Sequence, residues 1–228
     1  YELAVIMQDG IHRMYEKKEK VFYYITTMNE NYTHPEMPEG VEEGIRRGMY
    51  PLKIVGTPAQ DDANCLQLLG CGAILLQVEK AAGWLAENGY CSQVWSVTSF
   101  NELRRDGLGC ERQDFLSAGD TIEIPYVTRQ LQNTVGPIIA ATDYMKTYGD
   151  QIRPYIPENR EYKVLGTDGF GRSDTRENLR HFFEVDWQHI VWAALYELKK
   201  EGKVTNDVLV KVREELGINP AKLDPLYS

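Results

Sequence analysis

The clearest pattern along the chain is an alternation of short apolar runs with longer amphipathic segments. Residues 65–69 form a run, apolar except for Gln67, that is typical of a buried strand. They are followed by Ile74 to Leu85, whose apolar positions recur at helical spacing, and Asn88-Gly89 is suited to ending that helix. Other strand-like runs lie at Leu52–Val55, Ser92–Val97, Pro137–Ala141 and Tyr162–Gly166.

The same alternation predicts the fold class. A helix is expected to begin at Thr98 to Asn101, directly after the strand-like run Ser92–Val97. The chain then finishes in two amphipathic helices, one carrying Ile190 to Leu198 and the other Val208 to Leu216. Strands that alternate with helices predict an α/β fold of three layers, α/β/α, around a mostly parallel sheet.

The first 47 residues do not follow this alternation. Apolar positions from Leu3 to Tyr15 predict a helix, and the aromatic and β-branched run Val21–Thr26 predicts a strand. A turn-rich stretch after Asn29 is typical of an interdomain connection, with a short helix at Glu42 to Arg47. One helix and one strand cannot bury their apolar surfaces alone. They either pack on the rest of the chain or end a domain whose beginning is missing, and we favour the second interpretation.

Charge and composition narrow the function classes. The net charge is −9 and the basic runs are short, which argues against a nucleic-acid surface. We find no signal peptide and no apolar stretch of transmembrane length, and we expect a cytoplasmic protein without a membrane role. The four cysteines form no CxxC pair, so we expect reduced thiols in the core.

The most informative motif is the glycine-rich stretch from Leu165 to Asp174, between a predicted strand and a predicted helix. It is either a loop that faces a ligand or another subunit, or a structural turn, and spacing alone slightly favours the turn. The glycine spacing is not that of a dinucleotide site. Asp174 and Glu177 fit a capping box at the start of the next helix. The candidate residues for a channel or dimer interface are Asp168, Gly169, Phe170, Arg172, Ser173 and His181.

The four histidines, His12, His34, His181 and His189, show no metal-ligand spacing. We expect His189 to be a hydrogen-bonded residue of an apolar helix and His181 to lie at a helix C-terminus. His34, before Pro35, is the one best placed to face a ligand, although a solvated loop position is the simpler explanation and the one we favour. No nucleophile elbow or paired catalytic acid and base is present, so we assign no catalytic, cofactor-binding or metal-binding residue.

Several long strings resemble the homodimeric pyruvate dehydrogenase family, which forms the decarboxylating first component of its complex. They are Tyr23–Tyr32 with Met37–Gly40, Ser96–Leu103, Ala141–Lys146, and Val164–Ser173 continued by Glu177–His181. The resemblance runs nearly from end to end.

This resemblance implies a fold like the transketolase C-terminal domain. Residues 1–47 would then be the tail of a pyrimidine-binding domain with its connection, and residues 48–228 the C-terminal domain. It also implies an oxidoreductase that decarboxylates pyruvate with thiamine diphosphate and Mg²⁺ and reductively acetylates lipoyl groups, in a pathway continuing from glycolysis. The Gly-Asp-Gly motif that holds the diphosphate is not recognisable, and Gly166–Gly169 is only a near match. We therefore expect no cofactor on this chain alone.

The implied partners are a second copy of the chain, in a homodimer, and the dihydrolipoyl acetyltransferase component. The segment would support the dimer and border the substrate channel, and would be inactive alone. The alternative is a module of the same fold that binds a regulatory anion or a partner subunit. A sugar-transferring transketolase relative would share the fold, but the matching strings are those of the pyruvate enzyme.

Overall fold

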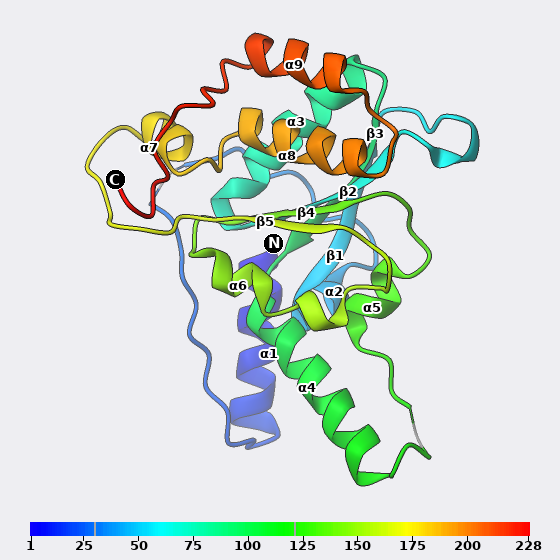
Figure 1. Ribbon diagram of the computed structural model, residues 1–228. Coiled ribbons are helices and arrows are strands. Elements are labelled where there is room, and N and C mark those ends of the chain that lie inside the picture. Colours follow the sequence, from blue (N-terminus) through cyan, green and yellow to red (C-terminus); the bar gives the residue numbers. More distant parts are fainter. Residues whose placement is uncertain (30, 121) are drawn as a thin grey trace.

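The computed structural model describes residues 1–29, 31–120 and 122–228, and the centre of this described part is a five-stranded sheet (Figure 1). Its strand order is β1-β3-β2-β4-β5. β3, β2, β4 and β5 run parallel, and β1 pairs antiparallel with β3. The predicted α/β class with a mostly parallel sheet is confirmed. The strands are β1 (Met49–Val55), β2 (Cys65–Cys71), β3 (Cys91–Val97), β4 (Ile138–Ala141) and β5 (Tyr162–Leu165).

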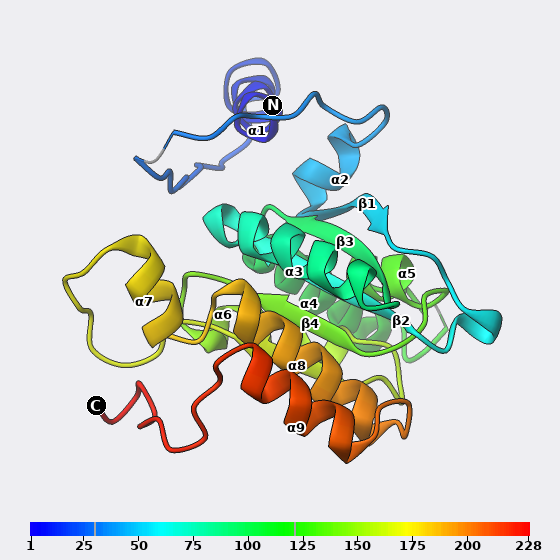
Figure 2. The same ribbon diagram turned by 90° about the horizontal axis from the view of Figure 1, so that it is seen from above.

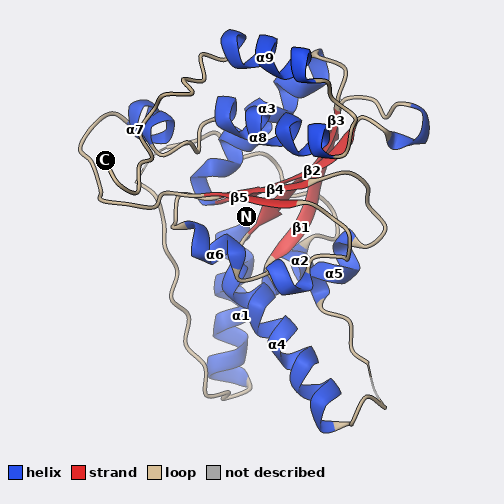
Figure 3. Ribbon diagram, viewed as in Figure 1, coloured by secondary structure: helices blue, strands red, loops and turns tan. Residues whose placement is uncertain are grey.

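Helices cover both faces of the sheet and complete the three layers (Figures 1 and 3). The larger cluster of buried side chains joins α3, α8 and α9 to one face, and a second cluster joins α4 and α5 to the other. The helices are α1 (Glu2–Ile11), α2 (Glu42–Arg47), α3 (Leu75–Glu87), α4 (Phe100–Leu116), α5 (Tyr126–Leu131), α6 (Lys146–Asp150), α7 (Arg176–Phe182), α8 (Trp187–Lys200) and α9 (Asn206–Glu215). Short helical turns follow or join them at His12–Glu16, Gln60–Asp62, Gly72–Ile74 and Arg153–Tyr155.

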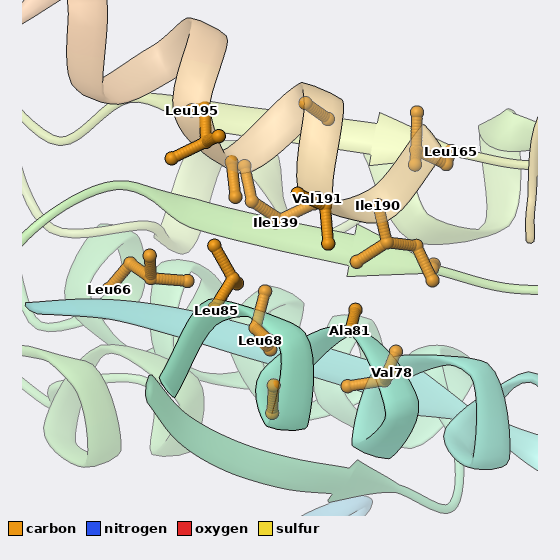
Figure 4. Packing of buried hydrophobic residues seen from close by; sticks show 14 of the residues in the cluster. Leu66, Leu68, Val78, Ala81, Leu85, Ile139, Leu165, Ile190, Val191 and Leu195 are labelled. Atoms are coloured by element: carbon orange, nitrogen blue, oxygen red, sulfur yellow. The ribbon is translucent and has the colours of Figure 1, made fainter. Parts of the chain in front are cut away.

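The central strand β2 explains why the sequence there shows no alternation. All seven of its residues are buried, because helices cover both faces of a parallel sheet. Leu68 and Ile139 face α3 and α8 within the larger cluster, with Val78 and Val191 beside them (Figure 4). Fully burying one such side chain stabilises the fold by about 1.5–3 kcal/mol.

One predicted helix start is wrong by one residue. The N-cap of α7 is Thr175, whose hydroxyl accepts a hydrogen bond from the backbone N–H of Asn178. Asp174, predicted as the cap, instead accepts from the N–H of Thr175 at 2.7 Å and from the side-chain amide of Asn178 at 2.8 Å. Two capping residues stand side by side here, and only the backbone conformation decides between them.

The N-terminal region contains a second difference from prediction. The helix over α1 and the short helix α2 are confirmed, but Val21–Thr26 is irregular rather than a strand. Among the described residues no strand lies alongside it, so its β propensity has nothing to pair with. Phe22 and Tyr24 are consequently 88% and 87% exposed. Figure 2 shows α1 and this segment beyond α2, on the side of the sheet away from α8 and α9.

Candidate functional site

The topology marks one point on the sheet where a ligand site is expected. β3 and β4 lie on opposite sides of β2, so the connections diverge at the carboxyl ends of β2 and β4. Asp143 lies at that point. Burial raises the pKa of its carboxyl group, and this effect outweighs the positive charge of Arg180, which lowers the pKa. Burial and the nearby Asp143 charge raise the pKa of the Cys71 thiol, at the end of β2, to about 12.

The loops that leave β4 and β5 are bound to each other at this edge. The N–H of Thr167 donates to the carbonyl of Tyr144 at 2.9 Å, and its hydroxyl donates to the carbonyl of Asp143 at 2.7 Å. The N–H of Lys146 donates to a carboxylate oxygen of Asp168 at 3.2 Å. These bonds fix the start of the glycine-rich loop at the carboxyl edge, as its position after a strand predicted.

A groove of about 560 Å³ opens at the same edge. The irregular segment Val21–Thr26 forms one wall, so residues far apart in the sequence meet here. The hydroxyls of Thr26 and Tyr144 form a hydrogen bond between the two walls. The wall on the side of the sheet contains Cys71, Thr98, Ser99, Phe100, Asn101, Glu102, Tyr144 and Tyr148.

The glycine-rich loop itself lies against the last residues of the chain rather than in the groove. Gly169 has φ +102°, and a Cβ placed on it would lie 2.3 Å from the carbonyl oxygen of Pro225. The guanidinium of Arg172 donates to the carbonyl of Ser228, and it lies 5.3 Å from the centre of the Phe182 ring. Gly169 is therefore required by a close backbone approach, which spacing alone did not distinguish from a ligand contact.

The other predicted interface residues divide into a bonded and an exposed set. Both carboxylate oxygens of Asp168 face Lys146, one at its N–H and the other 3.7 Å from its ammonium nitrogen. Phe170 and Ser173 are exposed. The loop does not fit a Mg²⁺-held diphosphate, because its carboxylate is already engaged and its central glycine abuts Pro225. His34 is exposed and lies outside these contacts.

His181 and His189 meet at one carboxylate that the sequence analysis did not single out. Nδ1 of His181 lies 2.7 Å from one oxygen of Asp186, and Nδ1 of His189 lies 2.5 Å from the other. One ligand atom from each residue lies within 4.8 Å of the other two. The available signal was an aspartate shortly before the predicted helix of Ile190 to Leu198, three residues before one histidine and five after another.

Asp186 is central to this cluster. It is the N-cap of α8, and its carboxylate accepts a hydrogen bond from the N–H of His189 at 3.0 Å. Burial would raise the pKa of Asp186, but the hydrogen bonds and charge of His189 and the hydrogen bond of His181 outweigh it and hold that pKa below its usual range. The prediction of a hydrogen-bonded, packed His189 is confirmed, since it is 7% exposed.

Two family models match the chain. The transketolase-like TK C-terminal domain matches residues 48–186, and the pyruvate dehydrogenase E1 component middle domain matches residues 1–35. The first match covers the sheet from β1 to β5 together with α7. The second covers α1 and the irregular segment that forms a wall of the groove.

The chain is also similar over almost its whole length to curated proteins called pyruvate dehydrogenase E1 component. It is 50% identical to that of Escherichia coli K12, 51% to that of Pseudomonas aeruginosa and 49% to that of Haemophilus influenzae. The alignments cover 99%, 99% and 100% of this chain and 25% of each relative. The chain thus spans about a quarter of the length of these relatives.

Among solved structures, transketolase from Leishmania mexicana gives a TM-score of 0.45 at 19% sequence identity, and the alignment covers 70% of this chain and 19% of the transketolase chain. Transketolase from Campylobacter jejuni gives 0.44 at 20% identity, covering 67% and 19%. In the described ranges, no helix has the length and apolar character needed to cross a membrane.

Proposed function

We propose, on the premise that this chain belongs to the pyruvate dehydrogenase E1 family and carries its transketolase-like C-terminal domain, that it is the C-terminal part of an enzyme that decarboxylates pyruvate. In that enzyme thiamine diphosphate and Mg²⁺ provide the chemistry, and the two-carbon unit passes to a lipoyl group. The cofactors bind in the part of that enzyme that precedes this chain, and the misfit between the glycine-rich loop and a diphosphate supports this assignment. The chain alone is inactive.

The observation that carries this proposal is the apolar face of α1. Leu3, Met7 and Ile11 of α1, continued by Tyr15 in the helical turn that follows, recur at helical spacing and are 43% to 77% exposed. Phe22 and Tyr24 continue the same kind of surface, and the middle-domain model matches this region. The opposite side of the helix already packs on α2 through a separate small cluster. Fully burying a wholly exposed side chain of this size contributes about 1.5–3 kcal/mol, so the half-exposed Leu3, Met7 and Ile11 would each contribute roughly half of that to a complex.

We assign residues 1–47 to the end of the pyrimidine-binding middle domain and its connection, and residues 48–228 to the C-terminal domain. The groove between Val21–Thr26 and the carboxyl edge of the sheet then lies where the two domains meet, and it borders the substrate channel. The exposed loop around Phe170 faces the second subunit of a homodimer. The acetyltransferase component of the complex is the further partner, and the enzyme works in the cytoplasm.

Complementation between two pieces tests this proposal. The part of the Escherichia coli relative that precedes the matched quarter is prepared separately and mixed with this chain, pyruvate, thiamine diphosphate and Mg²⁺. We expect CO₂ release from the mixture and none from this chain alone. Turnover by the upstream piece alone at the rate of the intact relative would contradict the proposal, as would an inactive mixture.

Variants locate the contact. Phe22→Ser and Tyr24→Ser should weaken complementation, because each removes an exposed aromatic side chain from the proposed domain contact. Ile54→Ser is the matched control: Ile54 is also exposed, at 65%, but it lies on β1 outside the groove and α1. Equal activity of all three variants would mean that the segment 21–26 is not the contact.

A further inference from the structure

The junction between α7 and α8 contains two imidazoles and a carboxylate that the proposed function does not use. His181 comes from the last turn of α7, Asp186 caps α8, and His189 lies in the first turn of α8. Nitrogen and oxygen ligands of this kind are what Zn²⁺ and related divalent ions take from proteins. We propose that His181, Asp186 and His189 bind one divalent transition-metal ion of the zinc type.

Burial makes this cluster a formed site rather than a chance surface grouping. Asp186 and His189 are 5% and 7% exposed, so the fold already holds two of the three ligands out of water. The N-cap bond from the N–H of His189 to Asp186 fixes their relative positions. The His181 side chain is 51% exposed, which leaves a path for an ion and space for water to complete the coordination.

The distances fit with a small rearrangement. The two Nδ1–oxygen distances of 2.7 Å and 2.5 Å are those of hydrogen bonds. Around a tetrahedral ion with metal–ligand bonds of about 2.0–2.1 Å, neighbouring ligand atoms stand about 3.3 Å apart. His181 must therefore move outward by roughly half an ångström, which its exposure permits. The buried His189–Asp186 pair must also open by about 0.8 Å, through a change of side-chain rotamer. The hydrogen bonds to Asp186 use the Nδ1 proton of each ring, whereas a ring that ligates an ion through Nδ1 carries its proton at Nε2, so ion binding exchanges the tautomer of both rings.

Charged side chains of both signs lie near the cluster. The ammonium of Lys222 donates to the carbonyls of His181 and Phe182 at 2.7 Å and 2.8 Å, and a carboxylate oxygen of Glu184 lies 3.3 Å from it. Arg180 precedes His181 and adds a second cation. These cations reduce the affinity of the cluster for any divalent ion. Mg²⁺ gains little from imidazole ligands to offset this repulsion, so it should bind far more weakly than Zn²⁺.

The ion would fix α7 to the body of the domain. α7 contributes no buried residue, and its contacts include the His181–Asp186 pair and the Lys222 bonds at its C-terminus. Through its other end α7 holds the glycine-rich loop, and Arg176 donates to the side chain of Asn29. Metal binding is thus expected to order α7 and the loop that precedes it.

Calorimetric titration of the chelator-treated chain with Zn²⁺ tests the site. We expect one ion per chain and at least about a tenfold weaker affinity in His181→Ala, a variant whose exposed position leaves the core intact. His12→Ala is the matched control, because His12 and Glu16 form an exposed histidine–carboxylate pair at 2.7 Å without a second imidazole. The control should bind Zn²⁺ like the original chain.

Two further measurements decide the interpretation. Amide exchange over 176–182 should slow when Zn²⁺ is added, and Co²⁺ should give the visible absorption of a nitrogen- and oxygen-ligated site. The proposal is overturned if the chain shows no saturable Zn²⁺ binding, if His181→Ala binds as well as the original chain, or if Mg²⁺ binds with equal affinity. Circular dichroism of each variant confirms that a lost site is not a lost fold.

Discussion

Replacing Gly169 with alanine separates a backbone contact from a ligand contact in the glycine-rich loop. Gly169 has φ +102°, a conformation that costs an L-residue about 1–2 kcal/mol. The new Cβ would also lie 2.3 Å from the carbonyl oxygen of Pro225 and 3.1 Å from the Cα of Leu226. Because the obstruction is backbone, it is relieved only if the residues around Pro225 move away from the loop.

The expected loss follows from two opposing effects. Alanine restricts the unfolded chain, which returns about 0.4–1 kcal/mol to the folded state. The strain and the contact with Pro225 outweigh this gain, and undocking of the C-terminal residues limits the total. We expect a net loss of about 1–2 kcal/mol, which for a domain of this size lowers Tm by roughly 2–8 °C.

Calorimetric unfolding measures the loss of stability, and amide exchange of residues 222–228 measures the undocking of the C-terminal residues. Gly171→Ala is the matched control, since Gly171 lies in the same loop without a positive φ and with nothing within 4 Å of its would-be Cβ. Gly169→Ala should lower Tm and speed exchange at the C-terminus, whereas Gly171→Ala should do neither. Equal behaviour of the two variants would refute the close approach to Pro225.

Four other predictions concern the core, the loop and the cofactor. Cys71 should react with iodoacetamide at pH 8 about a thousand times more slowly than an ordinary thiol, because its pKa is raised from 9.0 to about 12. As the pH rises above 9, the thiol ionises more readily in the unfolded chain than in the folded one, so the protein should lose stability while the thiol becomes more reactive. Gln67→Leu should cost about 2–4 kcal/mol in urea unfolding, since it orphans the Trp95 indole N–H and the Val135 carbonyl. Arg172→Ala in the longer enzyme should reduce turnover or dimerisation; lost response to an activator with turnover preserved would favour a regulatory site. Titration of this chain with thiamine diphosphate and Mg²⁺ should give no binding heat, and micromolar binding would place a cofactor site here.

Sequence pattern located the sheet because burial on both faces leaves an unambiguous signal. All seven residues of β2 are buried and all but Gln67 are non-polar, and the buried positions of α3 follow the helical period from Val78 to Leu85. Val21–Thr26 has equally strong β propensity but is not a strand. The difference is that a strand requires a neighbour, and propensity within one segment contains no information about its neighbour.

The candidate site was less predictable for a related reason. The loop from Gly166 to Ser173 was expected at the carboxyl edge, and its position follows from the strand before it. That Gly169 faces Pro225, more than fifty residues later, could not be inferred from local spacing. The His181–Asp186–His189 cluster was missed because the turn between α7 and α8 sets the three side chains together, and the sequence shows only an irregular spacing.

Hydrogen exchange of residues 1–29 tests most directly the claim that this chain completes a larger enzyme. The amides of α1 and of the segment 21–29 are followed in the chain alone and after addition of the upstream part of the Escherichia coli relative. We predict that exchange slows in both segments, because the exposed face around Met7, Ile11 and Phe22 becomes buried. Unchanged exchange there in a mixture that contains an excess of the upstream part would contradict the account.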